Sequence, residues 1–307
     1  MQRYPWEQGV AMQAFLEAGD MDIVIPMAIE SAYRCSADGR TAQLGDTVSV
    51  TDPCSTGEGL LEAWKRTGDP AIKKAFDGLL NWAMEGAPRN PEGIVYHRTD
   101  GPEFWADSVY MLPPFLAAAG EPDACLHQIY GYLDALQDPE TLLMRHMWDD
   151  ERKIFIRAAL WGTGSGWTVA GLARVIGLLP EAYAEERKKL TEITRRMLDS
   201  MLLYLREDGL FHDVLDDPGS FVETNCAQMT AYTIFRGIAE GWLPDTYLKA
   251  AQRMRLAALS KVDRFGRVQD ACGAPTFDKS GSSPEANAFC ILMETAAMQL
   301  GPDPINK

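Results

Sequence analysis

The stretch STGEGLLEAWKRTGDPAIKKAFDGLLNWAMEG, residues 55–86, contains two helix patterns separated by a very short turn. Leu60 and Trp64 have the four-residue spacing that places side chains on one buried face of a helix. In the turn, Gly68 ends the first helix and Pro70 begins the second, which is the usual order of these two residues at helix ends. The stretch therefore predicts a helical hairpin.

Similar turns recur about every 50 to 60 residues along the chain, a period typical of a repeated two-helix unit. They are Gly19-Asp20, Gly120-Glu121-Pro122, Gly177-Leu178-Leu179-Pro180 and Gly241-Trp242-Leu243-Pro244. With the apolar spacing, they predict helices near residues 6–18, 22–37, 55–67, 70–86, 105–119, 122–137, 165–178, 181–206, 223–240, 245–260 and 285–299.

These helices form five hairpins and one helix without a partner at the end of the chain. Six hairpins would close into a ring, and closure removes the open ends that a stack of repeats has to cap. We therefore predict an all-α fold, an (α/α)6 barrel of six helical hairpins, in preference to a two-domain bundle. It would be a single catalytic domain over residues 1–307. Either the first helix lies before Met1, or the last hairpin has an irregular second half.

Composition excludes several classes of partner. The formal net charge is −15, whereas nucleic-acid binding needs a basic face. No apolar run approaches the roughly 18 residues of a membrane span. The six cysteines are scattered without a CxxC motif, so we expect reduced thiols and neither a zinc site nor dithiol chemistry. The first residues lack the pattern of a signal peptide, which favours an intracellular protein.

Long connections between the hairpins predict where the functional face lies. Long loops in a compact domain are usually functional, and in a ring of hairpins they all lie on one rim. They cover residues 38–54, 87–104, 138–164, 207–222 and 261–284, and they contain His97, His146 and His212.

Aromatic, acidic and imidazole side chains gather on this rim, a combination suited to a sugar because indoles stack on pyranose faces while polar groups bind hydroxyls. The candidates are Trp6, Asp52, Trp105, Asp107, His146, Trp161, Thr163, Trp167 and His212. Taken singly, each has an ordinary structural role as well. Asp52 and Asp107 stand at helix starts, where aspartate is a favoured cap. His146 and the tryptophans are also common as buried structural residues. The sequence leaves both interpretations open.

The segment WADSVYMLPPFLA, residues 105–117, resembles the catalytic segment of the unsaturated rhamnogalacturonyl hydrolases, glycoside hydrolase family 105, and of the related unsaturated glucuronyl hydrolases of family 88. Three further segments resemble these families in the same order and spacing. They are TDPCSTGEGLLEAWKRTGDP, AALWGTGSGWTVAGLARVI and CGAPTFDKSGSSPEANAFCILME. The family fold is an (α/α)6 barrel, in agreement with the hairpins.

The resemblance implies the removal of an unsaturated uronic acid from the non-reducing end of lyase-generated oligosaccharides, by hydration of the C4=C5 double bond. It identifies Asp107 as the acid and base, and burial beside Trp105 would raise the pKa of this carboxyl. By the same resemblance Asp52 orients the substrate and Asp107, and His146 lies near the water or C4. Trp161 and Trp167 stack on the sugar, and Trp6, Trp105, Thr163 and His212 complete the expected substrate-binding set. No metal or organic cofactor is implied.

One position departs from the family. Many members have arginine where this chain has Thr163, and threonine supplies neither the charge nor the fork of a guanidinium. Either Arg145 or Arg157 takes over, or the substrate differs. Rhamnose is the family's usual aglycone, but unsaturated uronides from ulvan-type or glycosaminoglycan-type chains are also possible substrates.

Two other functions remain as alternatives. The same barrel could use Asp52 and Asp107 as a conventional acid and base on a saturated uronide such as a glucuronide, or it could bind sugar without catalysis. An epimerase is supported by the fold alone, which is a weak argument.

Overall fold

A computed structural model describes residues 4–44, 47–274 and 276–301. The chain divides into two compact units, which are described separately: unit 1 comprises Met1–Leu136 and Met147–Ala158, and unit 2 comprises Gln137–His146 and Ala159–Lys307. The prediction of a single domain over residues 1–307 stays a prediction. Within the described ranges, none of the helices is both long and apolar enough to span a bilayer.

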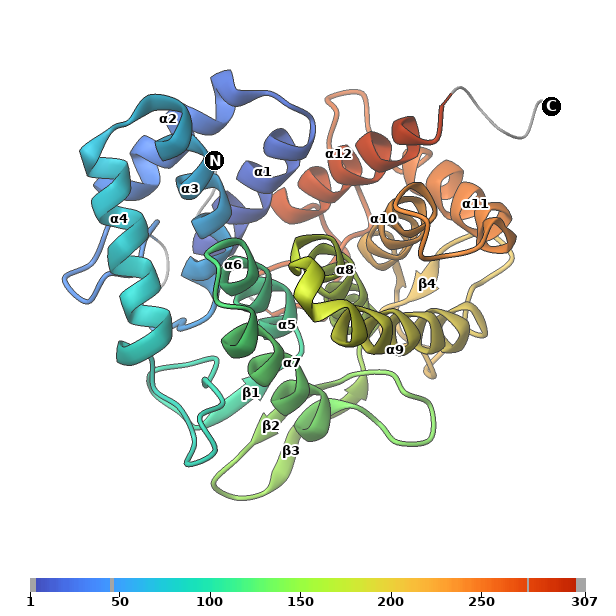
Figure 1. The fold of residues 1–307 in the computed structure, drawn as a ribbon. Coiled ribbons are helices and arrows are strands. Elements are labelled where there is room, and N and C mark those ends of the chain that lie inside the picture. The colour runs from blue at the N-terminus through green and yellow to red at the C-terminus, as the bar shows by residue number, and fades with distance from the viewer. Residues whose placement is uncertain (1–3, 45–46, 275, 302–307) are drawn as a thin grey trace. The chain divides into compact units, whose positions relative to one another are not determined.

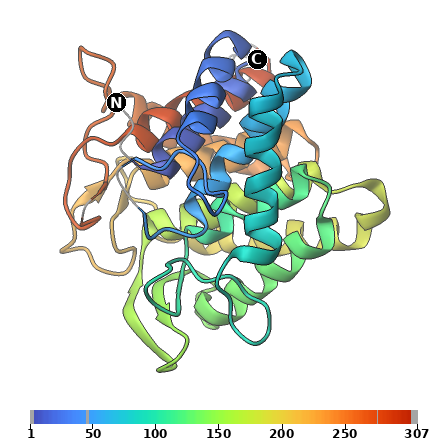
Figure 2. The ribbon, with the colours of Figure 1, turned by 90° about the vertical axis from the view of Figure 1, so that its left-hand side faces the viewer.

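Unit 1 contains three helical hairpins (Figure 1). Their helices are α1 (Pro5–Glu17) with α2 (Met21–Tyr33), α3 (Gly57–Thr67) with α4 (Pro70–Asn81), and α6 (Pro113–Ala118) with α7 (Pro122–Leu136). A 3-10 turn, η1 (Asp52–Thr56), leads into α3. Helices α2, α3 and α4 pack against one another, with α4 the long cyan helix at the front of Figure 2.

The hairpin of α3 and α4 forms for the reasons that its sequence suggests. Gly68 adopts a left-handed conformation with φ 69°, which glycine tolerates without strain. The Asp69 side chain accepts a hydrogen bond from the Ala71 N–H and so caps α4, while Pro70 is the first residue of that helix.

Unit 2 contains two further hairpins and the last helix. The hairpins are α8 (Gly162–Leu178) with α9 (Ala184–Leu202), and α10 (Asn225–Ala239) with α11 (Leu248–Leu259); α12 (Pro284–Gln299) packs on α10. Nearly every residue of α10 is buried, as in an inner helix covered on all sides. The five predicted hairpins and the final helix are thus confirmed within the described residues.

Short strands interrupt the long connections. β1 (Glu103–Trp105), β2 (Arg145–Asp149) and β3 (Ile154–Leu160) form a sheet in that order, with β1 antiparallel to β2. In unit 2, β4 (Phe211–His212) pairs with β5 (Val222–Glu223).

The helix predicted over residues 105–119 begins later than expected and is not continuous. Trp105 is the last residue of β1, and the helical part is divided into α5 (Ser108–Met111) and α6. Pro113 and Pro114 explain the break, because a proline lacks the N–H that would continue the preceding turn. The division leaves Asp107 at the junction of a strand and a short helix, a position that an unbroken helix would not provide.

Candidate active site

Backbone hydrogen bonds bring three distant segments of unit 1 together around His97. The Val50 N–H donates to the His97 carbonyl over 2.8 Å, and the His97 N–H donates to the Glu103 carbonyl over 2.7 Å. His97 is therefore held between the segment that leads into η1 and the segment that forms β1. Asp52 and Asp107 follow directly on these two segments.

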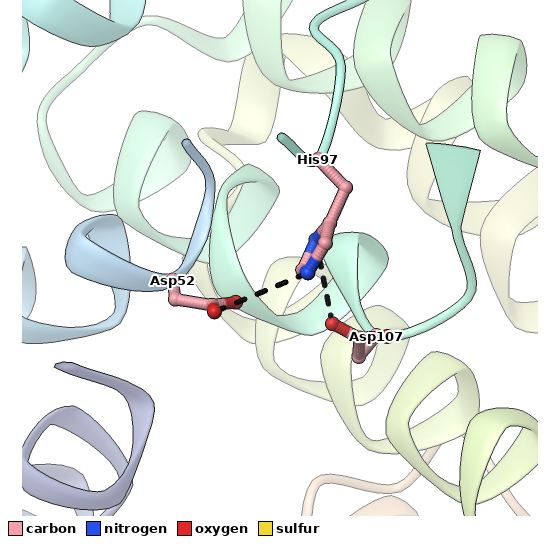
Figure 3. Close-up of side chains that lie close together, drawn as sticks. All are labelled: Asp52, His97 and Asp107. Atoms are coloured by element: carbon pink, nitrogen blue, oxygen red, sulfur yellow. Dashed lines mark ion pairs between the residues drawn. The ribbon is translucent and has the colours of Figure 1, made fainter. Parts of the chain in front are cut away.

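The imidazole of His97 lies between two carboxyl groups (Figure 3). Its Nε2 is 4.0 Å from Oδ2 of Asp52, and its Nδ1 is 3.5 Å from Oδ2 of Asp107. The exposed fractions of Asp52, His97 and Asp107 are 4%, 4% and 9%. The structure thus places Asp52 and Asp107, both candidates from the sequence, beside His97, which was not a candidate.

Trp105 supports the imidazole from one side. The two rings stack with centroids 4.3 Å apart and an interplanar angle of 17°, and the indole N–H donates to Glu103 Oε2 over 2.7 Å. In this position Trp105 restricts the orientation of His97 and helps to exclude water from it.

Burial sets the protonation states in this cluster. It raises the pKa of Asp107 to about 7, because an ionised carboxylate loses its hydration there. Burial, with the neighbouring charge of Arg98, lowers the pKa of His97 to about 3. Below neutral pH the cluster therefore contains a protonated carboxylic acid beside a neutral imidazole, a state suited to donating a proton.

Helix capping does not account for Asp107. The residue stands at the N-cap of α5, but its side chain makes no capping hydrogen bond to the described backbone of that helix. Its Oδ1 is buried and has no hydrogen-bond partner among the described residues. A buried acceptor without a partner lowers the stability of a fold by about 1 to 3 kcal/mol. Asp107 therefore does not stabilise the fold by capping a helix; its buried carboxyl group destabilises it.

One nitrogen of His97 and one oxygen from each aspartate lie within 4.8 Å of one another, a spacing that suits a metal ion. Carboxylates bind metals only when deprotonated, so an ion would compete with the proton of Asp107. The expectation that no metal is needed stays a prediction.

In unit 2, His146 and Trp161 stack with centroids 4.0 Å apart. The indole N–H of Trp161 donates to Oδ1 of Asp213 over 3.0 Å, and Phe277 meets the indole edge-on at 6.1 Å. With 2% of its surface exposed, Trp161 is covered by these neighbours. A catalytic role for His146 and sugar stacking by Trp161 stay predictions.

The other candidates have structural contacts as well. Trp6 stacks on Tyr4 at 4.4 Å in unit 1. In unit 2, Trp167 packs edge-on against Phe289 at 5.1 Å. Thr163 is a buried residue in the first turn of α8, and its hydroxyl lies 3.3 Å from the thiol of Cys272.

His212 uses both ring nitrogens within unit 2. Nδ1 lies 2.9 Å from the Ser220 carbonyl oxygen, and Nε2 lies 2.7 Å from a guanidinium nitrogen of Arg206. Arg145, a suggested replacement for the missing family arginine, forms an ion pair with Asp138 at 2.5 Å. Substrate binding by His212 stays a prediction.

The sequence profile described as Glycosyl Hydrolase Family 88 matches residues 1–287. The chain belongs to this family. Among curated relatives of this family 88 chain, the unsaturated rhamnogalacturonyl hydrolase YesR of Bacillus subtilis is 29% identical over 227 residues, which cover 70% of the chain and 64% of YesR. The unsaturated 3S-rhamnoglycuronyl hydrolase of an Alteromonas species is 22% identical over 218 residues, 63% of the chain and 50% of that protein.

Solved structures confirm the fold of the family 88 chain. A family 105 glycoside hydrolase from C. acetobutylicum superposes with a TM-score of 0.82 at 20% identity, covering 95% of the chain and 93% of that structure. A possible family 105 member from Salmonella enterica gives 0.84 at 20% identity, with 96% and 83% covered. The predicted six-hairpin glycosidase fold is therefore correct, as is the resemblance to families 105 and 88.

The sequence reasoning for this family 88 chain missed two buried residues. His97 was noted as a histidine of the rim, but its place between the aspartates depends on contacts between segments far apart in sequence. Glu223 received no role, yet it is completely buried in unit 2, and burial raises its pKa to about 7. Its carboxylate accepts hydrogen bonds from the backbone N–H groups of Cys226, at 2.6 Å, and Cys272, at 3.1 Å.

Proposed function

We propose that this chain removes a 4-deoxy-4-enuronosyl residue from the non-reducing end of oligosaccharides left by polysaccharide lyases. The observation that carries the proposal is the buried Asp107, whose pKa of about 7 makes it an available proton donor near neutral pH. The names of the Bacillus and Alteromonas relatives, both hydrolases of unsaturated uronyl substrates, support the same substrate class.

The proposed reaction adds water across the C4=C5 double bond. Asp107 gives its proton to C4, and the carboxylate that results accepts a proton from the water whose oxygen bonds to C5. The acid is thereby regenerated, and the product carries one additional water. This product is a hemiketal at C5, which opens and releases the aglycone from C1. One carboxyl group can serve both proton transfers because its pKa lies near the working pH.

The neighbouring groups have distinct roles in this proposal. Asp52 accepts hydrogen bonds from the substrate hydroxyls, and it lies on the opposite side of the ring of His97 from Asp107. His97 stays neutral, because burial lowers its pKa to about 3, and it fixes the separation of the two carboxyl groups. We also propose that His146, Trp161 and the other candidates contact the substrate.

The test follows the ultraviolet absorbance of the conjugated enuronate in lyase digests of rhamnogalacturonan and, separately, of ulvan. Loss of absorbance with release of a saturated sugar supports hydration, and the faster digest identifies the aglycone class. Asp107→Asn is expected to abolish the loss of absorbance, whereas Asp150→Asn, at another buried aspartate of unit 1, is expected to retain it.

Two outcomes contradict the proposal. One is a constant absorbance in both digests with protein shown to be folded. The other is hydrolysis of a saturated chromogenic glucuronide without any change in enuronate absorbance, which would identify a conventional glycosidase.

A further inference from the structure

Two dipeptides converge on His97 from opposite directions in the chain. Each contains one of the site's aspartates and a hydroxyl residue beside it: Thr51 precedes Asp52, and Ser108 follows Asp107. The Thr51 hydroxyl lies 3.0 Å from Nδ1 of His97 and the Ser108 hydroxyl 3.1 Å from the same nitrogen. The two hydroxyl oxygens are 3.2 Å apart. Both residues are completely buried, so these contacts are sheltered from competing water.

The hydroxyl groups matter because a neutral imidazole has one N–H donor and one acceptor nitrogen, and their assignment depends on the neighbours. On the Nε2 side of His97 lies the carboxyl of Asp52, which attracts an N–H and repels a lone pair. On the Nδ1 side, Thr51 and Ser108 can each donate an O–H. The two hydroxyls also contact each other, so one can donate to Nδ1 while the second donates to the oxygen of the first.

We propose that Thr51 and Ser108 are positioning residues: their hydroxyl groups hold Nδ1 of His97 as a hydrogen-bond acceptor and so keep its N–H on Nε2, directed at Asp52. This inference rests on the proposed function only where it concerns catalysis. The tautomer itself is a property of the free protein.

The tautomer has a consequence for Asp107, whose Oδ2 is 3.5 Å from Nδ1. An N–H on Nδ1 would stabilise the ionised carboxylate and lower the pKa of Asp107, which would weaken it as an acid at neutral pH. An acceptor at Nδ1 gives no such stabilisation. Charged or titratable neighbours in the described part of unit 1 include Arg98, which adjoins His97, the buried thiol of Cys54 beside Asp52, and Tyr132, whose hydroxyl donates to the Val95 carbonyl over 2.8 Å. The hydroxyl contacts of Nδ1 are those of Thr51 and Ser108.

The direct test is nitrogen NMR of the full chain labelled with ¹⁵N-histidine. The chain has four histidines, and His97→Gln identifies the signals of His97 by their loss. We expect the pattern of a neutral Nε2–H imidazole, unchanged between pH 5 and 8. An Nδ1–H pattern, or a charged ring at pH 6, would overturn the proposal without any reference to activity.

The variants Thr51→Val and Ser108→Ala, singly and together, remove the hydroxyls at nearly constant volume. We expect the double variant to shift His97 towards the Nδ1–H form and to lower kcat by about tenfold to 100-fold, the scale of a misplaced catalytic group, with KM nearly constant. The pH at which kcat falls on the alkaline side should move to lower values.

Thr194→Val is the matched control. Thr194 is completely buried in unit 2, and its hydroxyl donates to the Leu190 carbonyl over 2.8 Å. This variant loses a buried hydroxyl but should leave the His97 signals, kcat and the pH profile unchanged. If the folded double variant keeps the wild-type tautomer and pH profile, the hydroxyls are not positioning groups. Failure of the hydration assay with a confirmed tautomer would instead contradict the proposed function.

Discussion

Replacing Asp107 with asparagine should stabilise the protein at alkaline pH while abolishing its activity. Asparagine resembles the protonated acid in shape and has no charge to bury, so it removes the cost of ionising this carboxyl inside the fold. The activity should fall by about 10²-fold to 10⁴-fold, the usual contribution of a general acid and base. A residue that catalyses the reaction would thus be one that the fold is more stable without.

The pKa values give the magnitude and the sign. The pKa of Asp107 is about 7 in the folded chain against an ordinary 3.8, so the folded state binds the proton more tightly than the unfolded state. The loss of folding free energy caused by ionising Asp107 is therefore small below pH 4, grows as the pH rises, and reaches its full value above pH 7. With about 1.4 kcal/mol per pH unit, the cost of ionising Asp107 is about 2 kcal/mol at pH 5 and about 4 kcal/mol at pH 8.5.

Urea unfolding of both proteins at pH 5 and pH 8.5 measures this difference. Relative to wild type, Asp107→Asn should gain about 2 to 3 kcal/mol in free energy of unfolding between the two pH values. Asp150→Asn is the control with the opposite sign: hydrogen bonds from Lys153, Trp148 and Asn90 outweigh burial and lower the pKa of Asp150. That variant should lose stability at both pH values. A difference for Asp107→Asn that stays constant or shrinks at alkaline pH would refute the reasoning.

Three further expectations concern wild-type activity and packing. The kcat/KM of the wild type should fall about tenfold per pH unit above pH 7, as Asp107 loses its proton; a profile that rises through pH 8 would contradict its role as the acid. Gly9→Ala should lower the free energy of unfolding in urea by about 1 to 3 kcal/mol and reduce kcat, because the added Cβ would lie 2.6 Å from the backbone carbon of Ser55 in η1. Wild-type stability of this variant would show that η1 can move to make room for the methyl group. Trp161→Phe should cost about 1 to 3 kcal/mol by leaving Asp213 without its indole donor, and an unchanged midpoint of unfolding would show that this bond contributes little.

The helical hairpins could be predicted from sequence because their signals are local. Gly68, Asp69 and Pro70 each act on the backbone within a few residues of themselves, and the structure confirms each effect. The prediction over residues 105–119 fails for a local reason too: the apolar spacing continues across Pro113 and Pro114, whereas the helix breaks there.

The site was predictable only in part. Asp52 and Asp107 stand in segments that resemble a known family, and the structure places both beside one imidazole. His97 has no comparable local pattern, since its position depends on backbone bonds to Val50 and Glu103. The high pKa of Asp107 depends on burial by the whole unit, a property that no short segment carries.

Two buried carboxyl groups, Asp107 in unit 1 and Glu223 in unit 2, imply that this acidic chain takes up protons when it folds. Near pH 6 both groups are ionised in the unfolded chain, and both are mostly protonated in the folded chain because their pKa values are raised to about 7. These two groups should therefore take up close to two protons on folding, whereas His97 releases most of one because burial lowers its pKa from 6.5 to about 3; the net uptake of the three groups is about one proton. Calorimetry would record this as an unfolding enthalpy that varies with the ionisation enthalpy of the buffer. The formal charge of −15 counts both groups as ionised, so the folded chain near pH 6 carries about two fewer negative charges.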